Sequence, residues 1–118
     1  MMELSLIELI LPKGLLDYFE IRKVEQGDGI HIHLDEKAIK PVGSEVKLLE
    51  SKGFTQAVTL QDFPIRESAC YLHIRRRKWV NKSTGEIISN SWDLAGSGTR
   101  MTAELAAFLK EAPGYYIG

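Results

Sequence analysis

Alternation of apolar residues in two separate stretches is the feature that most limits how this chain can fold. In residues 30–34 every second position is isoleucine or leucine, and residues 70–74 place cysteine, leucine and isoleucine in the same rhythm. Side chains of a strand point alternately to its two faces, so this pattern gives an extended chain one buried and one exposed face. We predict a strand in each stretch, with His31 and His33 on the exposed face of the first.

The segments around these stretches favour hairpins. Residues 21–26 are followed by Gly27-Asp28-Gly29, which are typical turn residues, and then by the first alternating stretch. Residues 35–52 are mostly polar and are interrupted by Pro41 and Gly43, which predicts a loop with one helical turn. Further strands are predicted at 54–60, at 69–80 (the longest) and, after a turn at 81–85, at 86–89.

Helical spacing marks the two ends of the chain. Leu4, Ile7 and Leu11 predict a helical start within residues 1–20, with a break at Pro12 and Gly14. Thr102 is placed to cap a helix within residues 99–112, which Pro113-Gly114 would stop. With antiparallel strands confined to 21–92, the expected fold class is α+β. We expect one domain over 1–118, because 118 residues can bury a single core.

Several functional classes are disfavoured by composition. Cys70 is the single cysteine, so an internal disulfide is impossible, and this favours a reducing compartment. The N-terminal residues lack the basic region of a signal peptide, and no apolar run approaches the roughly 18 residues of a membrane span. We therefore expect a soluble cytoplasmic protein with no membrane partner.

The basic run Arg75-Arg76-Arg77-Lys78-Trp79 is the strongest functional signal. The chain carries a net charge of −1, but residues 66–82 hold six lysines and arginines against Glu67 alone. A guanidinium donates two parallel hydrogen bonds to phosphate, and local charge decides where a polyanion docks. One long strand over 69–80 would align Tyr71, His73, Arg75, Arg77 and Trp79 on one face, with Arg76 and Lys78 on the other. The expected DNA-binding residues are Arg75, Arg77, Trp79, Tyr71, His73, Arg76, Lys78, Lys82 and Arg66.

The basic run is also compatible with a purely structural role. Its arginines can pair with the sixteen acidic residues of the chain, or they can protect an edge strand from aggregation. Elsewhere, His31 and His33 share a strand face and could bind a metal with a third ligand, but exposed histidines are the simpler interpretation. Cys70 is in phase with Leu72 and Ile74, which predicts a packed thiol rather than a nucleophile. We predict no enzymatic activity, no metal, no cofactor and no small-molecule substrate.

The chain resembles the stand-alone transposase N-terminal region proteins of bacterial insertion sequences, which are related to the N-terminal part of zinc-ribbon transposases. The resemblance is strongest over residues 61–110. It implies a module that recognises the DNA of element ends and acts with a separately encoded catalytic transposase subunit. Zinc-ribbon relatives carry cysteine pairs, which residues 37–45 and 80–87 lack, so we expect a ribbon-like shape without metal. The matching segments are Leu11–Phe19, Gln61–Arg66, Ala69–Ile74, Arg75–Trp79, Trp92–Ala95, Gly98–Thr102 and Ala106–Lys110.

Two other functions are compatible with the same residues. The C-terminal helix has an apolar face with Leu105, Phe108 and Leu109, which is either core or a docking surface for the catalytic subunit. In the second case the chain is a protein–protein interaction module with little DNA affinity. The chain can also be an inactive relic of a transposase.

Overall fold

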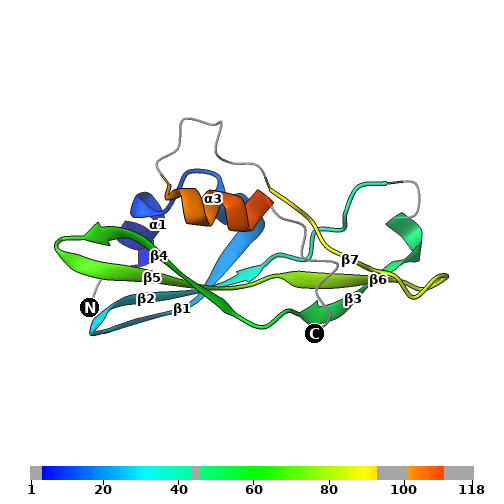
Figure 1. Ribbon diagram of the computed structural model, residues 1–118, viewed down its shortest axis with the longest axis horizontal. Coiled ribbons are helices and arrows are strands. Elements are labelled where there is room, and N and C mark those ends of the chain that lie inside the picture. Colours follow the sequence, from blue (N-terminus) through cyan, green and yellow to red (C-terminus); the bar gives the residue numbers. More distant parts are fainter. Residues whose placement is uncertain (1–3, 44–45, 93–100, 111–118) are drawn as a thin grey trace.

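Two hairpins lie side by side and form the first sheet of the fold. The structure, a computed structural model, describes residues 4–43, 46–92 and 101–110. The strand order is β1-β2-β5-β4 (Figure 1). The prediction of antiparallel strands throughout is wrong at the centre of this sheet, where β2 and β5 pair in parallel because the two hairpins meet through strands that run in the same direction. The two-residue turn between β4 and β5 is Arg66-Glu67, both with positive φ, as tight hairpin turns require. The four strands are β1 (Phe19–Gly27), β2 (Gly29–Glu36), β4 (Val58–Ile65) and β5 (Ser68–Arg75).

A smaller second sheet extends the molecule beyond the end of the first, so that the whole measures 49 × 28 × 23 Å (Figure 1). Its order is β3-β6-β7, and the predicted turn after β6 is present, with the Asn81 side-chain oxygen accepting a hydrogen bond from the Ser83 amide. The elements are the 3-10 turn η1 (Val46–Leu48), β3 (Leu49–Phe54), β6 (Arg77–Asn81) and β7 (Ile87–Ile88).

The helices α1 (Leu4–Ile10) and α3 (Ala103–Lys110) lie over the same face of the first sheet (Figure 1). The short helix α2 (Leu15–Tyr18) leads into β1. As predicted, the Thr102 hydroxyl caps α3, accepting a hydrogen bond from the Leu105 amide at 3.2 Å. None of the helices in the described ranges is long and apolar enough to cross a bilayer. The predicted stop at Pro113-Gly114 lies outside the described residues.

The alternation pattern correctly predicts which side chains of the first sheet are buried. Ile30, Ile32 and Leu34 are at most 3% exposed, whereas His31 and His33 lie on the outer face. The α+β class is confirmed. The core under the helices contains Ile7, Leu11, Leu15, Phe19, Ile30, Ile32, Leu34, Leu60, Cys70, Leu72, Ile74, Leu105 and Leu109.

The prediction of one strand over 69–80 is wrong, because the chain changes sheets at Arg76. β5 pairs in the first sheet and β6 in the second, and Arg76 belongs to neither strand. The burial pattern changes phase after the same residue: the even-numbered Leu72, Ile74 and Arg76 are buried up to this point, and the odd-numbered Trp79 and Asn81 are buried beyond it. Arg77 and Trp79 therefore do not simply continue the face of Tyr71 and His73.

The predicted strand at 54–60 also divides between the two sheets. Phe54 ends β3 and Val58 begins β4. Residues 35–52 contain the expected helical turn, η1, but also most of β3, which we did not predict. The Thr55 amide donates a hydrogen bond to the Arg76 carbonyl at 2.7 Å, and the Arg76 amide donates to the Thr55 hydroxyl at 3.1 Å. The segment that leads from β3 to β4 and the residue that joins β5 to β6 therefore lie side by side.

Gly29 is required at the tight β1–β2 connection. Its φ is +91°, and a Cβ there would lie 2.9 Å from the Ala69 carbonyl oxygen. We expect Gly29→Ala to destabilise the fold by about 1–2 kcal/mol, because the left-handed strain and the close contact add together. Urea unfolding followed by circular dichroism measures this. Gly43, with open space around its Cβ position, provides the matched control. Equal loss in the two variants would contradict the role given to Gly29.

Candidate functional site

Arg75 is neutralised inside the first sheet. Its Nε and Nη2 atoms each donate a 2.7 Å hydrogen bond to one carboxylate oxygen of Asp35, its partner in the parallel β2–β5 register. This bidentate hydrogen bonding, which outweighs burial, lowers the pKa of the Asp35 carboxyl below its ordinary value. The Arg22 guanidinium lies 3.5 Å from the same carboxylate. The Arg75 charge is therefore committed to the fold.

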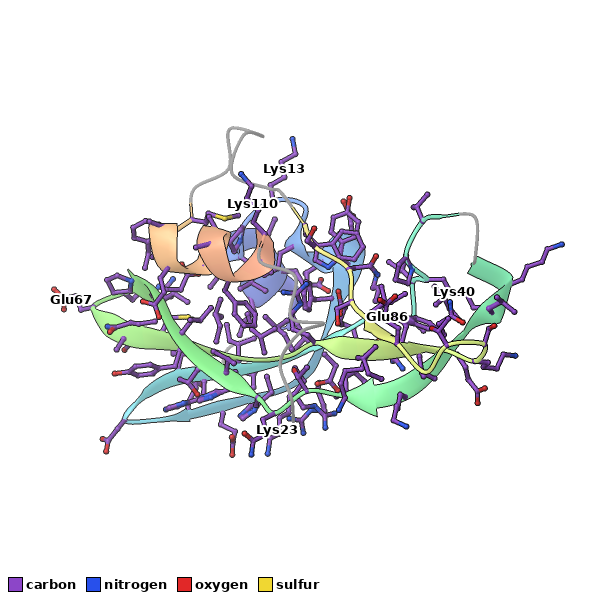
Figure 2. All side chains as sticks on the ribbon, turned by 45° about the vertical axis from the view of Figure 1, so that its right-hand side comes forward. Lys13, Lys23, Lys40, Glu67, Glu86 and Lys110 are labelled. Atoms are coloured by element: carbon purple, nitrogen blue, oxygen red, sulfur yellow. The ribbon has the colours of Figure 1, made fainter. Side chains whose placement is uncertain are left out.

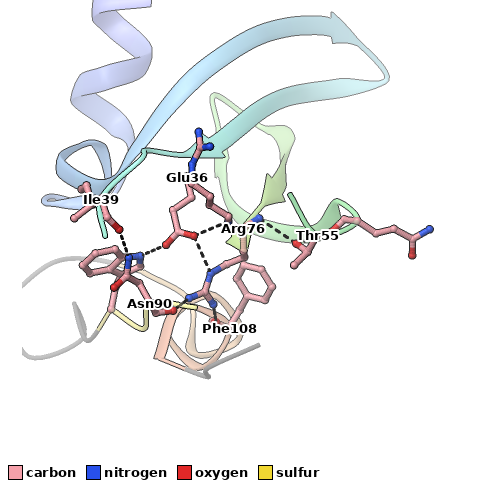
Figure 3. Close-up of polar contacts among 9 residues, drawn as sticks. Glu36, Ile39, Thr55, Arg76, Asn90 and Phe108 are labelled. Carbon is pink, nitrogen blue, oxygen red and sulfur yellow. Dashed lines mark hydrogen bonds and ion pairs between the residues drawn. The ribbon is translucent and has the colours of Figure 1, made fainter. Parts of the chain in front are cut away.

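Arg76 is only 1% exposed and forms a buried polar contact with Glu36, which is completely buried (Figure 3). Its guanidinium donates hydrogen bonds to the carbonyls of Asn90 and of Phe108 in α3. Glu36 in turn accepts hydrogen bonds from the Arg77 amide at 2.7 Å and from Trp92 Nε1 at 2.6 Å. Burial raises the pKa of the Glu36 carboxyl. This contact, the Arg76–Glu36 pair, joins the two sheets to α3.

Arg77 and Lys78 belong to the second sheet. The Arg77 guanidinium lies 4.5 Å from the Phe54 ring centroid, on which Arg75 also stacks at 4.4 Å, and it donates a hydrogen bond to the Ser51 hydroxyl at 2.9 Å. Lys78 alternates with Arg77 along β6 and is half-buried. Lys52 lies in the irregular stretch of β3 opposite Lys78, between the pairs Ser51–Trp79 and Phe54–Arg77.

Two more lysines, Lys47 and Lys82, lie in the segments next to β3 and β6 in the sequence. Lys82 follows β6, and its amide donates a hydrogen bond to the Leu48 carbonyl at 2.9 Å, so the turn lies against η1, which carries Lys47. Both side chains are exposed. Within the described ranges, these cations make no ion pair with a carboxylate, although Glu50 and Glu86 belong to the same region. We call the set Lys47, Lys52, Arg77, Lys78 and Lys82 the second-sheet cations.

The remaining predicted DNA-binding residues lie elsewhere. Trp79 is 4% exposed and packs inside the second sheet, so the expectation that it belongs to an exposed face is wrong. Arg66 lies in the β4–β5 turn next to Glu67, which Figure 2 shows at the opposite end of the molecule from Lys40 and Glu86. Tyr71 and His73 lie on the outer face of the first sheet. The nine predicted residues therefore do not form one surface.

All three histidines of the chain meet on that outer face. His31 Nδ1 lies 2.8 Å from His73 Nε2, and His73 Nδ1 lies 2.8 Å from the Thr59 hydroxyl. The rings of Tyr71, His31, His73 and His33 stack in that order, with centroids 4.6–5.0 Å apart. No group of three histidines, cysteines or carboxylates in the described part of the chain is arranged to hold a metal. We call His31, His33 and His73 the histidine cluster.

A groove of about 550 Å³ runs between the end of α1 and the β4–β5 hairpin. Leu9 and Ile10 expose apolar surface beside it, and Arg66 lies at its edge. Cys70 lies on its inner wall but is buried, and burial raises the pKa of its thiol to about 11. A protonated, inaccessible thiol is a poor nucleophile, which agrees with the packed role predicted for Cys70.

The apolar face of α3 is occupied by the protein's own core. Leu105 and Leu109 are completely buried, and Phe108 packs partly against the same cluster. The core interpretation of this helix is therefore confirmed. Docking of a partner through Leu105 and Leu109 would require α3 to leave the sheet.

Sequence reasoning missed four residues that shape this region: Asp35, Glu36, Phe54 and Lys52. Asp35 and Glu36 directly follow the alternating stretch and break its pattern, which is a weak local signal of a buried polar role. Their partners Arg75 and Arg76 lie 40 residues away in the sequence, and only the parallel pairing of β2 with β5 brings them together.

Comparisons with known proteins assign this chain to no group. A scan against protein-family models, a search of curated proteins and a search of solved structures each return no match.

Proposed function

We propose that this chain is a non-catalytic DNA-binding accessory module of an insertion-sequence transposase, acting with a separately encoded catalytic subunit. The observation that supports the DNA contact is the gathering of the second-sheet cations in a protein whose net charge is −1. The transposase setting rests on the resemblance of residues 61–110. Element-end DNA and the catalytic subunit are the proposed partners.

The charge distribution favours the second sheet over the basic run as a whole. The Arg75 guanidinium is paired with Asp35, and Arg76 is buried, so both charges are already engaged within the fold. The second-sheet cations keep their charge, and cations that neutralise phosphates release counterions and drive DNA association. Strands can contact DNA as helices do. The proposed phosphate contacts are therefore Lys47, Lys52, Lys78 and Lys82, because Arg77 alternates with Lys78 and packs on Phe54 and Ser51.

Reversing two of these charges tests the proposal. We expect Lys78→Glu/Lys82→Glu to weaken binding to an element-end duplex by at least about tenfold at low salt. We also expect it to reduce the slope of log K against log salt by about 2, since two phosphate contacts are lost. Fluorescence anisotropy at salt concentrations from about 50 to 200 mM measures both quantities.

The matched control changes the net charge equally at sites outside the second sheet. Lys23→Glu/Arg66→Asp does this, and aspartate tolerates the positive φ of position 66. It should bind within about twofold of the wild type, because exposed charges beyond a Debye length are screened. Equal losses in the two double variants would contradict a local contact. Salt-independent or absent binding by the wild type would contradict the DNA function itself and favour the interaction module.

A further inference from the structure

The histidine cluster lies on the two central strands and is linked to both edge strands of the first sheet. Glu25 of β1 accepts a hydrogen bond from His33 Nε2 of β2 at 2.8 Å, and the His33 ring stacks on His73 of β5 at 4.6 Å. His73 in turn contacts Thr59 of β4 through its Nδ1 atom. Side chains from all four strands are thus joined in one row on the outer face, in addition to the backbone hydrogen bonds.

One further contact of His73, with His31, depends on how many protons the two rings carry. In the 2.8 Å contact between His31 Nδ1 and His73 Nε2, one nitrogen donates and the other must accept. When both rings are protonated, both nitrogens are donors and the hydrogen bond is lost. Two adjacent imidazolium rings would also repel each other at a centroid distance of 5.0 Å.

We infer that the histidine cluster is a proton-sensitive clasp, which holds the four strands of the first sheet together at neutral pH and releases them on mild acidification. Among the described residues, the other charged groups in these contacts are Glu25 and Lys23 of β1, which pair with each other at 3.8 Å. One carboxylate therefore faces three imidazoles. Tyr71 completes the stack.

The direction of the pKa shift of His73 agrees with a clasp that opens on acidification. Burial, followed by the charges of His33 and His31, lowers the pKa of the His73 imidazole below 6.5, although Glu25 acts in the opposite direction. The unfolded chain then binds more protons than the folded one just below pH 6.5, so stability is present above this value and is lost as the pH falls. Because β5 continues through Arg76 into β6, loosening of the first sheet acts on the strand that leads into the second.

The carboxyl groups with shifted pKa values do not cause a loss of folding stability in the same pH range. The pKa values of the Asp35 and Glu25 carboxyls are lowered in the folded state. The stability that these two groups contribute to the fold is therefore lost only when the pH falls below their ordinary pKa values of 3.8 and 4.5. The pKa of the buried Glu36 carboxyl is raised, so its protonation favours the folded state as the pH falls, which is the opposite sign. A loss of stability between pH 7.5 and 5.5 therefore reports on the histidines.

Equilibrium unfolding of the full chain in urea, at pH 7.5, 6.5 and 5.5, tests the clasp. We expect the unfolding constant of the wild type to rise on acidification, by up to about tenfold per pH unit for each additional proton bound by the unfolded chain. His73→Gln should reduce this dependence, and the triple variant His31→Gln/His33→Gln/His73→Gln should abolish it. The control Gln61→Ala, at an exposed position that pairs with Tyr71 on the same face but carries neither charge nor imidazole, should keep the wild-type dependence.

Two results would overturn the inference. One is a wild-type stability that does not change between pH 7.5 and 5.5, and the other is the same dependence in wild type and triple variant. If the variants do not fold, NMR titration of the three imidazoles in the wild type decides the matter. The clasp requires at least one ring to titrate below 6.5 with a coupled, non-ideal curve, whereas three independent titrations at 6.5 or above exclude it.

Discussion

Replacing Arg76 by methionine is expected to destabilise the fold by about 3–5 kcal/mol, because it leaves a buried carboxylate without its cation. Arg76 is 1% exposed and Glu36 is completely buried, so water cannot take the place of the lost guanidinium. The carbonyls of Asn90 and Phe108 lose their donor in the same change. Denaturant unfolding at pH 7.5, followed by circular dichroism, measures the loss.

A double-mutant cycle distinguishes the lost ion pair from lost packing. Glu36→Gln removes the stranded charge, so we expect the double variant Glu36→Gln/Arg76→Met to be less destabilised than the sum of the two single variants. Lys52→Met, at an exposed position, serves as the control and should lie within about 0.5 kcal/mol of the wild type. An Arg76→Met variant within about 1 kcal/mol of the wild type would show that the Arg76–Glu36 pair does not hold the sheets and α3 together.

Leu72→Ala is expected to destabilise the fold by about 2–5 kcal/mol, through lost burial and the cavity that remains. Leu72 is completely buried in β5 and lies between Ile32 of β2 and Leu60 of β4, so its side chain packs at the centre of the first sheet. For a domain with a net stability of roughly 5–15 kcal/mol, this is a large fraction of the total. Thermal and denaturant unfolding both measure it.

A neighbouring residue on the opposite face gives the control for this prediction. Gln61 is exposed in β4 and pairs with Tyr71, so Gln61→Ala should change stability by no more than about 0.5 kcal/mol. If Leu72→Ala and Gln61→Ala have equal effects, the core does not lie on the face that the alternation pattern indicates.

Local patterns were sufficient to predict which side chains of β2 and β5 are buried and where α3 begins. Burial of Ile30, Ile32, Leu72 and Ile74 follows from a period of two, which every strand imposes on its side chains regardless of its partners. The cap of α3 at Thr102 follows from equally local chemistry. The change of phase at Arg76 left no such signal, because the four basic residues 75–78 contain no apolar position that would mark it.

The candidate site was predictable only as a region of charge. The sequence by itself determined that residues 66–82 are basic and that much of this segment is extended, since composition and periodicity are local properties. Only the tertiary structure decided which of these charges face solvent. Asp35 and Glu36 reach Arg75 and Arg76 through parallel pairing across 40 residues, and the chain changes sheets between Arg75 and Arg77. Such contacts depend on how distant strands pair, which no pattern within a single segment encodes.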